Sequence, residues 1–313
     1  MKPRHFLSIT DLKVGEIKKI LRLAIKLKKE LKTTGRNKLF FKNKTLAAIY
    51  EKPSLRTRLS FEAGMTQLGG HSIYLGPNDI QLGKRESSKD IGIVTSSMVD
   101  IIMARTFKHQ TVVDLAEGSS VPLINGLTDL EHPCQILADF QTILEKFKTL
   151  NNLTIVFVGD GNNNVTHSLA LMSAMLGNEF RCASPKGFQM KPSIKKQARI
   201  IAEKTKGKII ETTDPKKAVN KADVVITDTW TSMGKEAEKK KRIKIFAKYQ
   251  VNNKLIKLAK PKAIFMHCLP AYRGFEVSAE VIDGLQSVVY QEAENRLHAQ
   301  KALMIYLTQG GLG

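Results

Sequence analysis

Segment 51–62 (EKPSLRTRLSFE) carries side chains suited to binding an anion. It holds two hydroxyls, Ser54 and Thr57, and two guanidinium groups, Arg56 and Arg58, close together. A guanidinium offers a planar set of N–H donors that matches phosphate oxygens. The first turn of a helix adds backbone N–H groups that have no partner within the helix. These residue types and their spacing therefore predict a phosphate site at the start of a helix.

The two arginines of this segment are expected to have different roles. Residues two apart lie roughly 200° apart around a helix, so the two side chains are not expected to face one ligand. We predict that Arg56 binds the phosphate and that Arg58 forms a structural ion pair. The other predicted ligands are Ser54, Thr57 and the backbone N–H of Leu55. An ordinary capped surface helix with basic residues is the alternative that this segment alone leaves open.

Short apolar runs alternate with helical patterns along the chain, which predicts parallel sheets with helices on both faces. In the first half, the predicted strands are 45–50, 72–75, 100–104 and 121–125, with helices near 54–68, 87–97 and 111–117. In the second half, the predicted strands are 153–158, 180–183, 208–211, 224–227, 263–266 and 287–290, with a helix near 165–176. The pattern predicts an α/β fold with two doubly wound parallel-sheet domains.

Two long helices and a polar linker organise the first half. Residues 8–11 (SITD) are expected to cap an amphipathic helix that runs to about Lys32. A second long helix is predicted over 133–148, and the polar stretch 149–152 is typical of a linker. The boundary between the two domains is therefore predicted at 149/150.

Polar clusters follow the predicted strands at their carboxyl ends, where open parallel sheets bind ligands. The clusters begin at Ser54, Arg105, His132, Gly159, Asp228 and His267. Their joint placement predicts an active-site cleft between the two domains. The turn Gly159-Asp160-Gly161 begins like a dinucleotide fingerprint, but Asn164 stands where that motif requires glycine, so we favour a tight turn that displays asparagine side chains.

The formal net charge of +21 raises nucleic-acid binding as an alternative function. The distribution of charge argues against it, because lysines are spread through most predicted helices. Aromatic residues make up only 6 % of the chain and do not interleave with the basic clusters, as a base-stacking surface would require. We therefore favour a solvated lysine-rich surface, whose positive field would also attract anionic substrates.

Cysteine number and hydropathy set further expectations. Cys134, Cys182 and Cys268 are an odd number without zinc-site spacing, so neither a disulfide framework nor a metal is expected. No apolar run reaches membrane-spanning length, and the N-terminal residues lack the apolar region of a signal peptide. We expect a cytoplasmic protein with no membrane or nucleic-acid partner.

Five motifs together resemble the aspartate/ornithine carbamoyltransferase family. They are Ser54-Leu55-Arg56-Thr57-Arg58, Arg105-Thr106, His132-Pro133-Cys134-Gln135, Asp228-Thr229-Trp230-Thr231-Ser232-Met233-Gly234 and His267-Cys268-Leu269-Pro270-Ala271. They occur in the family's order, and the resemblance covers essentially the full length. The first and third motifs are shared with the aspartate enzymes, whereas the Asp-x-Trp-x-Ser-Met-Gly and His-Cys-Leu-Pro motifs are similar to those of the ornithine enzymes.

The resemblance implies transfer of the carbamoyl group of carbamoyl phosphate to the δ-amine of L-ornithine, giving L-citrulline and phosphate in arginine biosynthesis. It implies no cofactor and no metal. It implies a homotrimer or a multiple of trimers, with a carbamoyl-phosphate-binding domain, 1–149 plus about 295–313, on which the C-terminal helix packs back. Residues 150–294 would form the ornithine-binding domain. A carbamoyltransferase for another amine, such as putrescine, is one alternative, and a basic nucleic-acid-binding protein is another.

The resemblance also implies roles for single residues. The implied carbamoyl phosphate ligands are Ser54, Leu55, Arg56, Thr57, Gln81, Arg105, His132, Gln135, Cys268, Leu269 and Arg296, with Gln81 reaching into a neighbouring subunit. The implied ornithine ligands are Asn164, Asp228, Ser232 and Met233, with Asn163 as an alternative to Asn164. Arg105 and His132 would stabilise the oxyanion that develops in the reaction. Asp228 and Cys268 would steer the attacking amine.

The chain departs from the common family pattern in four places: Leu55 replaces threonine, the 162–164 run has one extra asparagine, Tyr272 replaces histidine and Phe275 replaces an acid. The last two changes could alter closure of the ornithine loop. Simpler roles stay open for four residues: His132 as a helix cap, Cys268 as a buried thiol, Asp228 paired with a lysine, and Arg296 paired with Glu292. Trp230 is expected to be a packing residue.

Overall fold

The computed structural model describes residues 3–83, 85–231 and 236–310. The chain divides into two compact units: unit 1 comprises Met1–Gln141 with Glu294–Gly313, and unit 2 comprises Thr142–Ala293. Within these described ranges, no helix combines the length and the hydrophobicity that crossing a membrane requires.

Unit 1 contains a four-stranded parallel sheet in the order β2-β1-β3-β4. Its strands are β1 (Thr45–Tyr50), β2 (His71–Leu75), β3 (Ile101–Arg105) and β4 (Leu123–Leu127). The two central strands, β1 and β3, are buried along nearly their whole length. Such continuous burial is what helices on both faces of a parallel sheet produce, and it explains the apolar runs of the sequence.

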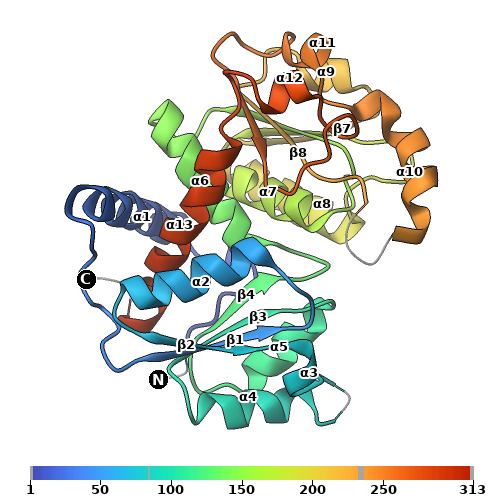
Figure 1. The fold of residues 1–313 in the computed structure, drawn as a ribbon. Helices are drawn as coiled ribbons and strands as arrows, with labels where there is room; N and C mark the ends of the chain where they lie inside the picture. The colour runs from blue at the N-terminus through green and yellow to red at the C-terminus, as the bar shows by residue number, and fades with distance from the viewer. Residues whose placement is uncertain (1–2, 84, 232–235, 311–313) are drawn as a thin grey trace. The chain divides into compact units, whose positions relative to one another are not determined.

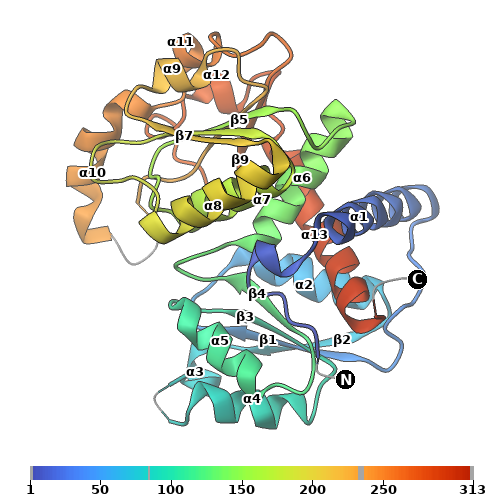
Figure 2. The ribbon, with the colours of Figure 1, turned by 180° about the vertical axis from the view of Figure 1, so that it is seen from behind.

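Helices cover both faces of this sheet. They are α2 (Leu55–Gln67), α3 (Pro77–Ile80), α4 (Ser88–Ser96) and α5 (His109–Gly118), preceded in the chain by α1 (Val14–Thr34). Figure 1 shows α2 on one face and α4 with α5 on the other, and the view from behind in Figure 2 agrees. The described residues of unit 1 thus form the doubly wound arrangement that the sequence predicts.

The C-terminal helix, α13 (Val289–Thr308), belongs to unit 1 from Glu294 onward. Its Lys301 Nζ donates to the side-chain oxygens of Asn37 and of Gln67, the last residue of α2, at 2.7 Å each. Near its end, the Tyr306 hydroxyl donates to Glu16 in α1. These contacts confirm the prediction that the C-terminal helix packs back on the first part of the chain.

Unit 2 contains a five-stranded parallel sheet in the order β7-β6-β5-β8-β9. Its strands are β5 (Thr154–Val158), β6 (Glu179–Ala183), β7 (Lys208–Thr212), β8 (Val224–Thr227) and β9 (Ile264–His267). The sheet order reverses at β5, which lies between β6 and β8. The neighbouring strands β5, β8 and β9 end at one edge, so the residues that follow them lie close together.

The helices of unit 2 also lie on both faces of its sheet. They are α7 (Asn164–Met175), α8 (Pro192–Thr205), α9 (Pro215–Val219), α10 (Lys239–Phe246), α11 (Asn253–Ile256) and α12 (Ala279–Ile282). In Figures 1 and 2, α7 and α8 cover one face, whereas α9, α11 and α12 lie on the other. A further helix, α6 (Pro133–Phe147), contains the chain division at Gln141/Thr142.

The expected cap of the first long helix is wrong. Ser8 caps a separate 3₁₀ turn, η1 (Ile9–Asp11), and the Asp11 side chain accepts from the Ser8 N–H. Leu12 is extended, so this turn does not continue, and α1 begins only at Val14. The capping box therefore closes a short turn in place of a long helix.

The strand predicted over 287–290 is also wrong. Ser287 forms only an isolated bridge with Phe265, and Val289 already begins α13. The β-branched run at this point favours a strand locally, but packing of the long helix overrides that preference. The strand predicted over 121–125 lies two residues later, as β4, and Pro122 before it has no N–H to donate to a sheet.

Candidate active site

The predicted anion segment occupies the turn between β1 and α2 in unit 1. Ser54 is the N-cap of α2, and its Oγ accepts from the backbone N–H of Thr57 at 3.3 Å. This turn follows the carboxyl end of β1, next to Arg105 at the end of the neighbouring strand β3. The predicted helix start is confirmed.

Four side chains from separate elements of unit 1 meet at Thr57, and they are called here the Thr57 cluster: Thr57, Arg105, Gln135 and Arg296. Arg105 Nη1 and Arg296 Nη2 donate to Thr57 Oγ1 at 3.4 and 3.2 Å. Arg296 Nη1 donates to Gln135 Oε1 at 2.6 Å. All four side chains are buried. Two guanidinium groups are therefore held side by side at the start of α2.

Electrostatics around the Thr57 cluster favour an anion. His132 is buried, and desolvation together with the charges of Arg296 and Arg105 lowers its pKa well below the ordinary value. Lys52 and Arg56 lower it further. His132 is therefore neutral at neutral pH and can donate one N–H without adding charge. Burial keeps His132 neutral, and the nearby cationic side chains add to this effect. Such a group of cationic side chains is typical of a phosphate site.

Lys52 is a site candidate that the sequence analysis missed. It is buried, and its Nζ lies 4.8 Å from the centre of the Phe107 ring. Desolvation and the charge of Arg105 lower the pKa of Lys52 to about 8. The signal in the sequence was a lysine immediately before Pro53, inside the anion segment.

The predicted division of roles between the two arginines is confirmed for Arg58. Its Nε donates to Glu62 Oε1 at 2.9 Å, and its guanidinium lies 3.9 Å from the centre of the Tyr74 ring. Arg56 is half-buried and acts electrostatically on His132. Its role as a phosphate ligand remains a prediction.

Gln81 is the carbamoyl phosphate ligand that the resemblance implies for a neighbouring subunit. It follows α3 in a left-handed conformation, with φ at 51°, and its side chain is exposed. No hydrogen bond within the described ranges joins it to the cluster.

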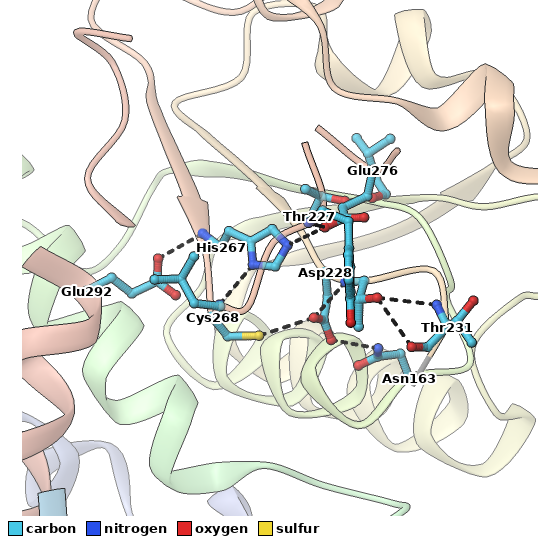
Figure 3. Close-up of polar contacts among 12 residues, drawn as sticks. Asn163, Thr227, Asp228, Thr231, His267, Cys268, Glu276 and Glu292 are labelled. Carbon is cyan, nitrogen blue, oxygen red and sulfur yellow. Dashed lines mark hydrogen bonds and ion pairs between the residues drawn. The ribbon is translucent and has the colours of Figure 1, made fainter. Parts of the chain in front are cut away.

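In unit 2, three side chains form a second group, called here the Asp228 cluster: Asn163, Asp228 and Cys268. Asp228 follows β8 and Cys268 follows β9, and these strands are neighbours with Thr227 opposite His267. Cys268 Sγ donates to Asp228 Oδ1 at 3.2 Å, and Asn163 Nδ2 donates to Asp228 Oδ2 at 2.9 Å (Figure 3). Each oxygen of the buried Asp228 carboxylate therefore accepts a hydrogen bond from a side chain, which fixes its orientation.

The two candidate asparagines have different positions. Asn163 is the N-cap of α7, and its Oδ1 accepts from the Val165 N–H at 2.7 Å while its amide group holds Asp228. Asn164 is the first residue of α7 and is half-buried. The contact between Asn163 and Asp228 has no signal in the sequence.

His267 holds the turn that carries Cys268. Its Nδ1 accepts from the Leu269 N–H at 2.9 Å, so the ring proton lies on Nε2, which faces Glu276 Oε1 at 3.2 Å (Figure 3). Leu269 has a φ of 56°, a left-handed conformation that this bond helps to hold. Ligand atoms of Asp228, His267 and Cys268 lie within 4.8 Å of one another, but metal binding by His267 would break one of these contacts.

The remaining predicted residues have different outcomes. Trp230 is buried and stacks on Phe246 at 5.9 Å, which confirms its packing role. The departures Tyr272 and Phe275 line a cavity of about 110 Å³, and Lys239 Nζ lies 5.5 and 5.9 Å from their ring centres. The predicted ornithine ligands Ser232 and Met233 lie outside the described residues.

Comparison with known proteins covers both units. Residues 4–145 match the family described as "Aspartate/ornithine carbamoyltransferase, carbamoyl-P binding domain". Residues 151–307 match "Aspartate/ornithine carbamoyltransferase, Asp/Orn binding domain".

Individual relatives agree with these matches over the full length. The ornithine carbamoyltransferase of Caldicellulosiruptor saccharolyticus is 51 % identical over 307 residues, which cover 98 % of this chain and 99 % of the relative. The solved ornithine carbamoyltransferase of Pyrococcus furiosus has a TM-score of 0.94 and 47 % identity, covering 100 % and 99 % of the two chains. The anabolic enzyme of Campylobacter jejuni has a TM-score of 0.92 and 40 % identity, covering 99 % and 100 %. The chain belongs to the aspartate/ornithine carbamoyltransferase family.

Proposed function

We propose that this protein transfers the carbamoyl group of carbamoyl phosphate to the δ-amine of L-ornithine, producing L-citrulline and phosphate for arginine biosynthesis. The observation that carries the proposal is the Thr57 cluster, in which two buried guanidinium groups share one hydroxyl at a helix N-terminus. This arrangement suits a small dianion. The names of the relatives support the choice of reaction.

Carbamoyl phosphate binds in unit 1 in this proposal. Its phosphate lies at the start of α2, on Ser54, the Leu55 N–H, Arg56 and Thr57, and Lys52 adds positive charge. Its carbamoyl group meets Arg105, His132, Gln135 and Arg296. Arg105 and neutral His132 donate to the carbonyl oxygen and stabilise the charge that develops on it.

Ornithine binds in unit 2, at Asp228 with Asn164 or Asn163, and with Ser232 and Met233. Cys268 and Leu269 lie beside both substrates. The δ-amine must be neutral to attack the carbonyl, because an ammonium group has no lone pair. The Asp228 carboxylate attracts this amine and directs its lone pair. The Cys268 thiol donates to this carboxylate and thereby fixes its direction.

The reaction forms one bond and breaks one. The δ-nitrogen attacks the carbonyl carbon, the C–N bond forms, and the C–O bond to phosphate breaks. The phosphate leaves with the bonding electron pair and takes up a proton from the former amine. We propose that residues 1–149 with about 295–313 form the carbamoyl-phosphate domain and that residues 150–294 form the ornithine domain.

Assembly and location belong to the same proposal. The protein is a cytoplasmic homotrimer, or a multiple of trimers, in which exposed Gln81 reaches the carbamoyl phosphate of a neighbouring subunit. Analytical ultracentrifugation tests the trimer directly: a monomer at micromolar concentration with full activity would contradict this role of Gln81.

A choice of amines tests the substrate. We expect saturable citrulline formation with ornithine and little product with putrescine. Saturable carbamoylation of putrescine, without reaction of ornithine, would contradict the proposed acceptor while leaving the carbamoyl phosphate site intact. Binding of duplex DNA at physiological salt, with no transfer to either amine, would favour the nucleic-acid alternative.

A further inference from the structure

Arg242 in α10 is a fully buried arginine that the proposed reaction does not use. Its side chain is 2 % exposed, and that of its partner Asp160 is 4 % exposed. Arg242 Nη2 donates to Asp160 Oδ2 at 2.5 Å. The guanidinium also lies 5.0 and 5.5 Å from the ring centres of Phe188 and Phe246. Burial of two charges is costly, so such a pair calls for a reason beyond stability.

Asp160 organises the turn between β5 and α7. Its Oδ1 accepts from the Asn162 N–H at 3.0 Å, and its backbone carbonyl accepts from Thr166 Oγ1 at 3.1 Å. The turn leads directly into Asn163, the N-cap of α7. The orientation of Asn163 therefore depends on the conformation that Asp160 imposes.

Asn163 passes this orientation to the reactive groups. It donates to Asp228, which in turn accepts from Cys268 (Figure 3). A continuous series of contacts thus runs from Arg242 through the 160–163 turn to the Asp228 cluster. Every member of the series lies within unit 2.

We propose that Arg242 is a positioning residue for the ornithine site, acting through Asp160 and Asn163 on the direction of the Asp228 carboxylate. The inference rests on the proposed function of Asp228. A guanidinium is required because its Nη2 donates to the carboxylate while its planar group lies against two aromatic rings. A lysine ammonium keeps the charge but offers no flat face to the two rings.

The Arg242→Lys variant tests the proposal against a matched control, Arg181→Lys. Arg181 is a half-buried arginine of β6. It pairs with Glu179 and donates to the backbone carbonyls of Ala218 and Asn220. Both variants should lose stability. Only Arg242→Lys should raise the KM for ornithine, by about tenfold or more, with the KM for carbamoyl phosphate nearly unchanged.

Alkylation of Cys268 by iodoacetamide gives a readout that does not depend on turnover. Cys134 and Cys182 are fully buried, so Cys268 is the accessible thiol. A carboxylate beside a thiol disfavours the thiolate, which is the form that reacts. Displacement of Asp228 should therefore speed alkylation several-fold in Arg242→Lys and leave it unchanged in Arg181→Lys.

A double variant, Arg242→Met with Asp160→Asn, separates positioning from stability because it removes both buried charges. We expect it to recover thermal stability while the ornithine KM stays raised and alkylation stays fast. A double variant with wild-type thermal stability, ornithine KM and alkylation rate would overturn the inference. An Arg242→Lys variant that changes only the melting temperature would overturn it as well. If the wild type forms no citrulline, the proposed function fails. Alkylation still tests the positioning role separately, because an unchanged rate in the Arg242 variants would contradict it.

Discussion

At the scale of single residues, Thr57 explains how the anion site is built. One hydroxyl oxygen accepts from Arg105 at the end of β3 and from Arg296 in α13. The two arginines are 191 positions apart in the printed sequence, so only the fold brings them together. Their shared acceptor holds the two guanidinium groups next to one another, an arrangement that suits a dianion.

Arg56 and Arg58 provide a matched pair of substitutions. Arg56→Ala should reduce the affinity for carbamoyl phosphate by about tenfold or more, because it removes a charged donor from the predicted phosphate site. Arg58→Ala should cost only about 0.5 kcal/mol of stability, because its ion pair with Glu62 is partly exposed. Initial-rate kinetics and thermal unfolding measure both effects. Equal loss of carbamoyl phosphate binding in the two variants would contradict the assigned roles.

Lys52 should make phosphate binding depend on pH. Its pKa is lowered to about 8, so the charge is present below that pH and disappears above it. Inorganic phosphate is mostly a dianion above pH 7.5, and its Kd should rise several-fold between pH 7.5 and 9.5 as Lys52 deprotonates. Isothermal titration calorimetry measures this change.

The control for Lys52 lies at the other end of β1. Lys44 forms an exposed pair with Asp100, so Lys44→Met should leave the pH dependence intact. Lys52→Met should weaken binding at pH 7.5 and flatten the profile. A profile that persists in Lys52→Met would assign the pH dependence to another group.

Much of the candidate site was predictable from the sequence, because many of its residues belong to recognisable motifs. The residues that hold these motif residues in place were not predictable. The motifs of Arg56, Arg105, His132, Asp228 and Cys268 follow strand ends in the chain, where topology alone indicates a ligand site. The supporting contacts of Asn163, His267 and Arg242 depend on three-dimensional neighbours, and sequence spacing does not encode those neighbours.

At the scale of elements, alternating apolar runs predicted the parallel strands well because buried strands need continuous hydrophobicity. The failures were local. The run at 287–290 has strand-forming residues, yet Val289 begins α13 because the long helix packs on unit 1. The capping box at Ser8 closes only the η1 turn because Leu12 is extended.

The packing of α4 against α5 gives a test at this scale. A Cβ on Gly92 would lie 2.3 Å from the Leu115 carbonyl oxygen, closer than any real contact. Gly92→Ala should therefore force the helices apart and cost about 1–3 kcal/mol. Gly15→Ala in α1 has nothing within 4 Å of the new Cβ and should be neutral or stabilising by up to about 1 kcal/mol.

Urea denaturation of the two glycine variants measures this difference. Gly92→Ala should be less stable than the wild type. Gly15→Ala should be as stable as the wild type or more stable. A Gly92→Ala protein as stable as wild type would show that α4 and α5 can separate without cost, contrary to the close approach seen here.

At the scale of the whole molecule, the charge of +21 and the two-unit organisation fit one anionic and one cationic substrate. In the proposed reaction, a positive surface field draws carbamoyl phosphate, whereas the local negative charge of Asp228 attracts ornithine. The two units carry these opposite tasks separately, and each has its own sheet and its own polar strand ends. The family matches to residues 4–145 and 151–307 follow the same order.

Transfer from carbamoyl phosphate labelled with ¹³C at the carbonyl measures the proposed reaction itself. With ornithine as acceptor, labelled citrulline and phosphate should appear in a 1:1 ratio, and omission of ornithine should abolish both products above the spontaneous rate. Enzyme-dependent release of phosphate without labelled citrulline, or no product at all from the folded protein, would show that the protein does not carry out this transfer.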